Sequence, residues 1–373
     1  MQNPISDPIG RRRRRAASLP DDMIAEILAR VPYRSLCRFK CVSRSWLVLC
    51  SDRGIRSRCP QTLSGFFYNF YRSGPSMRFV RTSERCAPIE DPLLSFLPAS
   101  HRDIYVHIVD TCNGLLLCDR GLGHSILDPA PAPAGTRYFV CNPATGNWID
   151  LPDVAQMKTR WLGQIIRLGF DPAVSSHFRV FLVVHAPVYF GLLQEVVGVQ
   201  IYSSESKSWA YKQSGWGNDA IVSQDSRSAF FSGTLHLTSP GSPSSILTLD
   251  IDGKTWGNIA TPCHFDFIGL SRGNLYAVHM DRGRHGDCRL SIWVLEDYAT
   301  HKWTMKHHVM CSPRMFCMVY AIHPEDSLIF ISVWMERVLL SYDFSNGKTC
   351  SVDKLGENSA HLYPYIPCFS DAP

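Results

Sequence analysis

Residues 199–209 read Val199-Gln-Ile-Tyr-Ser-Ser-Glu-Ser-Lys-Ser-Trp209, which is a short strand-forming run, a turn of small polar residues and a tryptophan. β-branched and aromatic residues favour strands, and Ser, Asn, Asp and Gly favour tight turns. We therefore expect a β-hairpin here. Four other stretches repeat the order, the last with Cys in place of Trp: Tyr138 to Trp148, Ile246 to Trp256, Ile292 to Trp303 and Leu339 to Cys350.

The spacing of these copies predicts the fold. Trp209, Trp256, Trp303 and Cys350 follow one another at intervals of 47 residues. The interval from Trp148 to Trp209 is 61, which indicates an inserted loop of 14 residues. A period of about 40 to 50 residues with several strands in each repeat is typical of a β-propeller.

A second type of strand lies between the copies, and we expect it to be an inner strand that precedes each hairpin. Together these runs predict five recognisable blades. Strands within residues 63–82 and 362–369 are expected to pair and close a sixth, which would leave no exposed sheet edge. The second-type runs are Cys112 to Cys118, Phe178 to Val183 after Gly169-Phe-Asp-Pro172, Ser232 to Leu237, Arg272 to Ala277 and Asp326 to Ile331.

The tryptophans raise the question of a ligand site. One tryptophan at a fixed place in each repeat favours packing between blades over ligand binding. We therefore predict a structural, blade-packing role for four residues: Trp148, Trp209, Trp256 and Trp303.

The first fifty residues have a different, helical pattern. Pro20 suits a helix start, and the two following aspartates suit the positive end of the helix dipole. Ile24, Ile27, Leu28 and Val31 then fall at the spacing of one helix face. Leu36 and Phe39 indicate a second short helix, and Ser43 is a candidate N-cap for a third that carries Trp46 and Leu47.

Three short helices bury little area, so a domain of this size usually needs a partner. We refer to residues 16–58 as the helical cassette. It could dock on another protein, or it could be an amphipathic cap on the chain's own next domain. The sequence alone does not separate the residues that would form the docking surface from those that would hold the helices together.

The cassette resembles an F-box. The matching motifs are Leu19-Pro20, an acidic turn, Ile27-Leu28, Val31-Pro32, where Leu is commoner than Val, Leu36, and Cys41-Val-Ser-Arg-Ser-Trp46. The resemblance implies docking on the Skp-type adaptor of a cullin-based ubiquitin ligase. The residues it implies for that surface are Leu19, Pro20, Ile24, Ile27, Leu28, Leu36, Val42 and Trp46.

The body also resembles a family. Cys112-Asn-Gly-Leu-Leu, Asn142-Pro-Ala-Thr-Gly-Asn-Trp148 with Leu151-Pro152, and Gly169-Phe-Asp-Pro172 look like the F-box-associated, kelch-like domain of plant F-box proteins. The expected fold is α+β multidomain, with a three-helix F-box at 16–58 and an all-β propeller at 59–373, after a basic tail at 1–15. The expected function is a substrate-recognition adaptor of an SCF-type ubiquitin ligase, with no catalytic residues and no cofactor. Its partners would be the Skp-type adaptor, through it a cullin, and an unknown target protein.

Composition agrees with an ordinary globular chain of 373 residues, with 45% hydrophobic and 19% charged residues. The 14 cysteines form no Cys-x-x-Cys or other spacing typical of zinc. Free thiols, with no signal peptide, favour the cytoplasm or nucleus.

Residues 1–15 carry +4 of the net charge of +5, so the body lacks the basic footprint of a nucleic-acid-binding protein. The run Arg11–Arg15 could be a nuclear localisation signal, a phosphate-binding patch or a solvated tail.

Two other functions are open. The propeller could sense a small molecule or glycan through loop residues such as Trp161 or Tyr189, with a ligase role secondary or absent. It could also be an enzyme, which a cluster of carboxylates with raised pKa in the central channel would favour.

His307-His308 is a poor metal pair because adjacent strand residues face opposite ways. Asp250-Ile-Asp252 is explained by turn formation, and the longest apolar stretch, Val180 to Leu193, is too short to span a membrane. We expect no metal site and no membrane partner.

Overall fold

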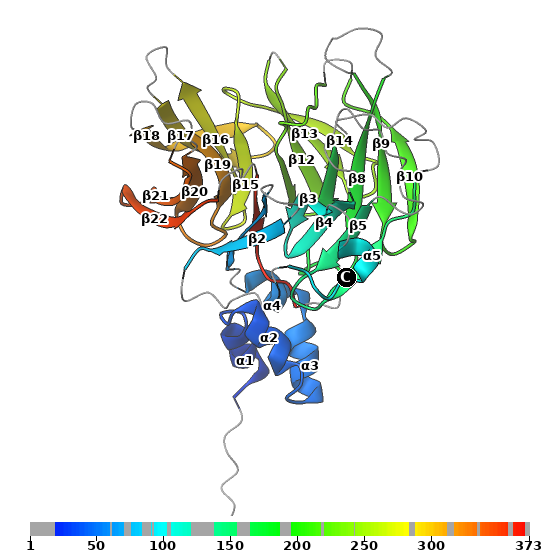
Figure 1. The fold of residues 1–373 in the computed structure, drawn as a ribbon. Helices are drawn as coiled ribbons and strands as arrows, with labels where there is room; N and C mark the ends of the chain where they lie inside the picture. The colour runs from blue at the N-terminus through cyan, green and yellow to red at the C-terminus, as the bar shows by residue number, and fades with distance from the viewer. Residues whose placement is uncertain are drawn as a thin grey trace, which may run out of the picture.

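The chain folds into a small group of helices and a ring of β-sheets, and Figure 1 shows the helices in blue beneath the ring. The computed structural model describes residues 19–59, 62–70, 76–83, 91, 93–102, 106–120, 138–154, 165–186, 195–217, 220–241, 243–282, 288–311, 317–333, 336–356 and 361–369.

The helical part has the three predicted helices and one more. They are α1 (Asp21–Leu28), α2 (Tyr33–Phe39), α3 (Arg44–Ser51) and α4 (Arg53–Arg58). The predicted cap of α3 is present, since Ser43 Oγ accepts a hydrogen bond from Trp46 N at 3.2 Å. Asp52 caps α4 through its bond from Ile55 N at 3.1 Å. Helix α4 was not predicted, because its six residues include Gly54 and show no apolar periodicity.

Five four-stranded antiparallel sheets form blades 1 to 5, and each was predicted from its tryptophan hairpin or the matching Cys350 copy. Within each blade the strands follow the chain from the centre outward. Blade 1 holds β3 (Val106–Cys112), β4 (Leu115–Arg120), β5 (Tyr138–Asn142) and β6 (Asn147–Asp150). Blade 2 holds β7 (Ile166–Gly169), β8 (Arg179–His185), β9 (Val196–Ser203) and β10 (Ser208–Gln213). Blade 3 holds β11 (Ser228–Phe231), β12 (Thr234–Ser239), β13 (Ser245–Asp250) and β14 (Trp256–Ala260).

Blade 4 holds β15 (Phe267–Ser271), β16 (Asn274–Arg282), β17 (Cys288–Asp297) and β18 (Lys302–Cys311). Blade 5 holds β19 (Cys317–Ile322), β20 (Leu328–Val333), β21 (Val338–Asp343) and β22 (Lys348–Lys354). The short helix α5 (Ala99–Arg102) precedes blade 1. Gly253 and Gly347, in the predicted turns, have φ of 70° and 74°, which suits glycine at a hairpin turn.

Both ends of the sheet-forming chain build the sixth blade, as predicted. It has three described strands in the order β2 (Ser76–Arg81), β1 (Gly65–Phe70) and β23 (Leu362–Tyr365). Gly65 pairs with Tyr365 and Tyr68 pairs with Leu362. The structure is therefore a six-bladed propeller whose ring is closed by hydrogen bonds between residues 300 positions apart.

The innermost strands are β3, β7, β11, β15, β19 and β23, and each contacts the next around the ring. The runs that we expected to be inner strands are β4, β8, β12, β16 and β20, which lie second from the centre. Of the innermost strands, only β23 was predicted; the other five were not, because most are short and several carry polar or charged residues. Arg167 on β7 is one example.

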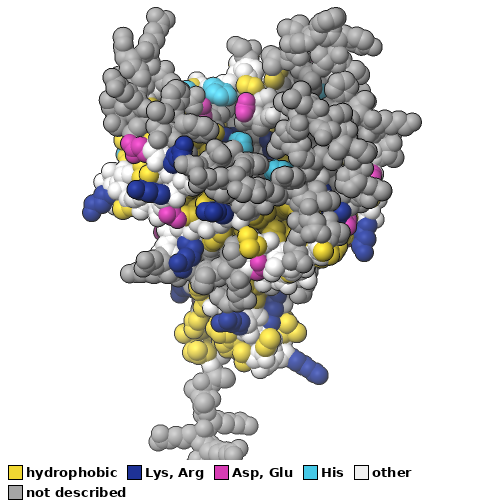
Figure 2. Space-filling view, viewed as in Figure 1, with side chains coloured by type: hydrophobic (Ala, Val, Ile, Leu, Met, Phe, Trp, Pro, Cys, Tyr) yellow, Lys and Arg dark blue, Asp and Glu magenta, His cyan; other side chains and the backbone are white. Residues whose placement is uncertain are grey.

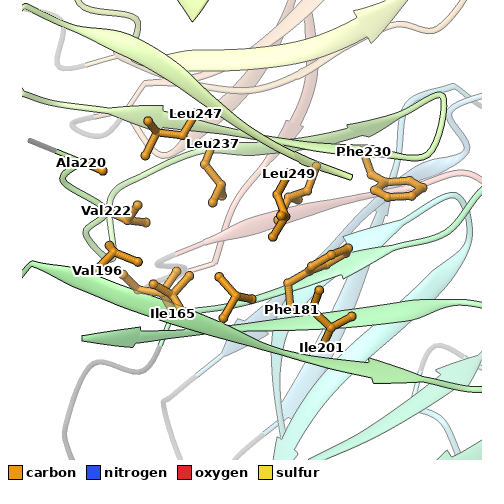
Figure 3. Close-up of a cluster of buried hydrophobic side chains, with 13 residues drawn as sticks. Ile165, Phe181, Val196, Ile201, Ala220, Val222, Phe230, Leu237, Leu247 and Leu249 are labelled. Carbon is orange, nitrogen blue, oxygen red and sulfur yellow. The ribbon is translucent and has the colours of Figure 1, made fainter. Parts of the chain in front are cut away.

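The hydrophobic core is divided among the gaps between blades. Figure 3 shows one such cluster, in which Phe181 and Ile201 of blade 2 face Leu237, Leu247 and Leu249 of blade 3. Phe181 is fully buried, with its ring centre 6.3 Å from that of Phe230. Burial between sheets is the main source of stability in such a ring, because no blade can cover its own two faces.

The motif at the start of blade 2 has a packing reason. A Cβ added to Gly169 would lie 2.7 Å from the Phe230 ring and 2.8 Å from the Phe181 ring. Only glycine therefore allows β7 to approach these two aromatic side chains. Asp171 Oδ1 accepts a hydrogen bond from Ala173 N at 2.9 Å and forms the turn that follows.

The motif residues of blade 1 fasten the closing segment. Asn142 is fully buried, and its Nδ2 donates to the Cys368 carbonyl at 3.0 Å. Gly114 has φ of 92°, and an added Cβ there would lie 2.5 Å from the Ile366 carbonyl oxygen. Asn113 Nδ2 donates to the Phe170 carbonyl at 2.7 Å, which ties blade 1 to blade 2.

Two of the repeated tryptophans bond to the preceding blade. Trp209 Nε1 donates to the carbonyl of Pro152, which follows β6, at 2.7 Å. Trp303 Nε1 donates to the carbonyl of Ala260, at the end of β14, at 3.0 Å. Both side chains are half-buried on the outermost strand of their blade.

The other two tryptophans contact connecting segments. Trp256 meets Trp216 at a ring-centre distance of 4.7 Å, and Trp148 meets His101 of α5 at 4.4 Å. The four tryptophans thus contact a preceding blade or a connecting segment, and their blade-packing role stays a prediction. Cys350 is exposed on β22 of blade 5, which is not the closing blade.

Candidate functional site

The buried residues of the cassette form a small core of their own. Leu28 and Leu36 are 1% and 0% exposed and pack with Cys50, Ile55 and Cys59. The Cys59 thiol donates to the Leu28 carbonyl at 3.5 Å, and burial raises its pKa to about 11. Leu28 and Leu36, which were expected on the docking surface, therefore hold the helices together.

Two further residues of the expected docking set are half-buried. Trp46 packs edge-to-face on Phe39 with ring centres 5.5 Å apart, which fixes α3 against α2. Ile24 lines the same core from α1. Each has only part of its side chain available to a partner.

A row of apolar residues on α1 is exposed. Leu19, Met23 and Ile27 are 50%, 53% and 49% exposed, and they follow one another at intervals of four residues. Met23 and Ile27 lie four residues apart on the same side of α1, and Leu19 lies two residues before the helix begins; we call these three residues the α1 row. The exposed Pro20 lies beside its first member.

A second exposed set lies at α3. Val42, just before the helix, is 61% exposed, and Leu47 and Val48 within it are 46% and 71% exposed. We call these three residues the α3 group. Figure 2 shows hydrophobic side chains across the visible face of the cassette. Concentrated exposed apolar surface of this kind marks an interaction site.

Three of these exposed apolar residues, Met23, Leu47 and Val48, were not in the expected docking set. Met23 could have been found, because it lies four residues from both Leu19 and Ile27. Leu47 and Val48 could not be sorted from Trp46 and Leu49, since a run of four apolar residues has members on every side of a short helix.

The cassette is also basic. Residues 19–58 contain eight Arg or Lys and four Asp or Glu, which gives +4. Glu26 is paired with Arg58 at 2.6 Å and with Arg30 at 3.4 Å. The hydrogen bond from Arg58 lowers the pKa of Glu26 and joins α1 to α4. The cassette therefore presents apolar side chains within a positively charged surround.

The polar residues of the propeller that the sequence singled out have structural partners. His307 Nε2 lies 2.6 Å from the Tyr342 hydroxyl of blade 5, so it bridges two blades. Asp250 Oδ1 accepts from Lys254 N at 2.7 Å within a hairpin turn. Among the described residues, no group of three or more His, Cys, Asp or Glu side chains is placed to hold a metal ion.

One buried carboxylate lies near the centre of the ring. Burial raises the pKa of Asp110 on β3, and the positive charge of Arg167 opposes that rise. Asp110 accepts hydrogen bonds from Leu168 N at 2.8 Å and Thr111 N at 2.9 Å. It is thus a bonded group that joins β3 to β7, and not half of a carboxylate pair.

Comparison with known families decides the assignment. The F-box domain model matches residues 17–58, and the model of the F-box associated beta propeller domain matches residues 77–343. The chain belongs to the F-box proteins with this associated propeller. F-box domains bind Skp-type adaptors in SCF complexes, and proteins with this pair of domains are typically non-catalytic adaptors.

Its relatives include plant F-box proteins. F-box protein At5g07610 of Arabidopsis thaliana is 26% identical over 79% of this chain and 70% of its own length. F-box protein At5g49610 of the same plant is 27% identical over 78% and 79%. Among solved structures, a chain of the nidogen/laminin complex has a TM-score of 0.43 at 11% identity, over 80% of this chain and 95% of that one.

Two sequence hypotheses concern residues outside the described part of the chain. They are the basic run Arg11–Arg15 and the two loop aromatics, Trp161 and Tyr189. Within the described part, no helix is both long and apolar enough to cross a bilayer.

Proposed function

We propose that this F-box protein is a substrate-recognition adaptor of an SCF-type ubiquitin ligase. Its cassette would dock a Skp-type adaptor, and through it a cullin, while the propeller holds a target protein. The observation that carries the proposal is the α1 row, which leaves three large apolar side chains about half-exposed although the cassette has a core. Such a surface is expected to be covered in the working protein.

We assign the docking contacts to the exposed members of the expected set and to the three that it missed. The positive charge of the cassette would favour a partner with an acidic surface and speed their association. Leu28 and Leu36 would act only by shaping the surface, and Ile24 and Trp46 by supporting its edges. The proposed contacts are Leu19, Pro20, Met23, Ile27, Val42, Leu47 and Val48.

The propeller would contribute position and no bond chemistry. Held at a fixed place relative to the cassette, a bound target would be close to the ubiquitin-charged enzyme. We assign the target to a protein, with no cofactor and no nucleic acid, and the site of action to the cytoplasm or nucleus. The four repeated tryptophans would serve only to hold blades together.

Co-expression with a Skp-type adaptor tests the proposal. The double variant Met23→Asp/Ile27→Asp places two charges in the α1 row, and burying them in an interface costs several kcal/mol. We expect wild type to co-purify with the adaptor and the variant to be lost from the complex. The thermal unfolding of the variant should match wild type, because both side chains are about half-exposed.

The matched control is Met305→Asp/Met310→Asp on β18. These methionines are 49% and 54% exposed, close to the values of Met23 and Ile27, but they lie on blade 4. The control should co-purify as wild type does. Retention of the adaptor by Met23→Asp/Ile27→Asp would exclude the α1 row as the docking surface, and failure of wild type to bind would contradict the adaptor role.

A further inference from the structure

The centre of the propeller holds two arginines in different electrostatic situations. In a propeller the innermost strands surround a central channel. Arg167 lies on β7, the innermost strand of blade 2, and Arg227 directly precedes β11, the innermost strand of blade 3. Both residues have an intermediate exposed fraction and are therefore half-buried.

Arg167 is fully engaged within the fold. Its guanidinium donates to the Ile166 carbonyl at 2.9 Å and to the Ser226 carbonyl at 2.7 Å. It also faces the buried carboxylate of Asp110, whose charge offsets its own. Arg167 therefore joins blades 1, 2 and 3 and has little capacity left for a ligand.

Arg227 is held by its backbone and not by its side chain. Its N–H donates to Thr238 Oγ1 at 2.8 Å, and its carbonyl accepts from Thr238 N at 2.9 Å. Within the described residues its guanidinium makes no hydrogen bond and no ion pair. The five donors of this side chain are thus on a fixed base and unoccupied.

The charge of Arg227 affects the pKa of groups in other blades. The pKa of Arg167 is lowered by burial and lowered further by the charge of Arg227. The pKa of His361, beside β23, is likewise lowered by burial and by Arg227. Burial raises the pKa of Tyr320 on β19, and Arg227 opposes that rise. These three groups lie on or beside the innermost strands β7, β23 and β19. Arg167 also bonds the carbonyl of Ser226, the residue directly before Arg227, so Arg227 lies at the inner surface of the ring beside Arg167.

We propose that Arg227 is the centre of an anion-binding site in the propeller channel, which accepts a carboxylate or phosphate group. An unpaired guanidinium beside a second cation gains more from an anion than an isolated surface arginine does, because a bound negative charge relieves the repulsion. The planar fork suits both groups through two parallel hydrogen bonds.

The neighbours of Arg227 are consistent with a small anionic group. Tyr320 on β19 is 7% exposed, and its hydroxyl is already engaged within the fold, where it donates to Met318 Sδ at 3.7 Å. Asp225 is the carboxylate close to this cluster, and it raises the pKa of His361. It is exposed and makes no ion pair among the described residues, so it does not occupy Arg227.

The anion can come from an acidic or phosphorylated side chain of a target protein, or from a free small anion. As a contribution to target recognition, the first source rests on the proposed adaptor function. The site itself does not, because anion binding can be measured on the full chain without the adaptor. The test therefore separates the two claims.

The experiment measures binding of inorganic phosphate by calorimetry. It also measures binding of three peptide pools, with phosphoserine, glutamate or serine at the central position, by fluorescence polarisation. We expect phosphate or the two acidic pools to bind the wild-type chain more tightly than the serine pool. Arg227→Gln should weaken that binding about ten-fold or more, as expected for the loss of charged hydrogen bonds. Arg227→Lys should lie between, since it keeps the charge and loses the fork.

Arg289→Gln is the control, because Arg289 is an exposed arginine on β17. It should bind as wild type does. Equal binding by Arg227→Gln and wild type, or no binding of phosphate or either acidic pool by wild type, would overturn the proposal. If Arg227→Gln does not fold, Arg227→Lys carries the comparison. Arg227-dependent binding of the acidic pools identifies a protein source, and such binding of phosphate alone identifies a free anion. Co-purification with the Skp-type adaptor should be unchanged in all three variants.

Discussion

The cassette and the propeller differ in how their exposed apolar side chains are distributed. Of the described residues, six large apolar side chains are exposed within residues 19–48, and six more are spread over the whole propeller and its connections. In the cassette they form the α1 row and the α3 group. In the propeller they are scattered, as isolated exposed apolar residues are on most proteins.

The difference teaches that the two parts satisfy their hydrophobic surface by different means. Each face of a blade is covered by the next blade, and the ring closes on itself through β1 and β23. The four short helices of the cassette bury only a small core of residues such as Leu28 and Leu36. No neighbouring unit covers the rest of their apolar surface as one blade covers the next. We therefore expect a partner to cover the exposed apolar surface of the cassette, while the propeller closes on its own chain.

The largest effect should come from opening a contact between blades. Phe181→Ala removes a fully buried ring from the cluster between blades 2 and 3. We expect it to lower the free energy of unfolding of the propeller by about 3–5 kcal/mol, measured by urea denaturation. Met310→Ala, at a 54% exposed position, should change it by less than about 0.5 kcal/mol. A similarly small change for Phe181→Ala would mean that the blades do not depend on one another as the structure implies.

A smaller effect should separate the two parts by pH. Burial lowers the pKa of His236 on β12 to about 4, and residues 1–59 contain no histidine. The unfolded chain binds this proton near pH 6.5 and the folded chain does not, so stability should fall as the pH drops from 6.5 toward 4. The loss is on the order of 3 kcal/mol when complete.

His236→Leu should reduce this loss of propeller stability, measured by denaturation at pH 7 and pH 5. Unfolding of the cassette should be nearly constant over that range. An unchanged pH dependence in His236→Leu would show that other propeller groups cause the loss of stability. Candidates are His185 and His361, whose pKa values are also lowered by burial.

The smallest effect should arise in the cassette. Ser43→Ala removes the side-chain cap of α3, which bonds Trp46 N. The expected loss of cassette stability is about 1 kcal/mol, measured by thermal unfolding. Ser43→Asp should keep most of it, because aspartate caps equally well. A loss in Ser43→Asp as large as in Ser43→Ala would assign another role to the hydroxyl.

Much of the fold could be predicted because it repeats. The constant distance from Trp209 to Trp256 to Trp303 indicates one structural unit used several times, and hairpin turns such as Asn346-Gly347 mark its edges. The sixth blade could be predicted because a ring of five must still join its ends. The innermost strands of blades 1 to 5 could not be predicted, since a run such as Ser228–Phe231 is too short to show a period.

The candidate sites were harder to predict. Which apolar residues of the cassette are exposed depends on how four short helices pack, and periodicity alone placed Leu28 and Ile27 in one set. Arg227 gave no sequence signal at all. Its proposed anion-binding role depends on groups from blades 2, 5 and 6, which only the closed ring brings together. The most distant in sequence is His361, 134 positions away.

The pairing of Gly65 with Tyr365 has a consequence for synthesis. A ribosome adding about 5–20 residues per second needs roughly 15–60 s to make the 300 residues between them. During that time β1 waits in the cell with an open hydrogen-bonding edge and with Phe66 and Phe67 lacking their final neighbours. We therefore expect the nascent chain to need protection from aggregation until β23 has been made, and a stop codon that removes only the last dozen residues would remove the strand that closes the ring.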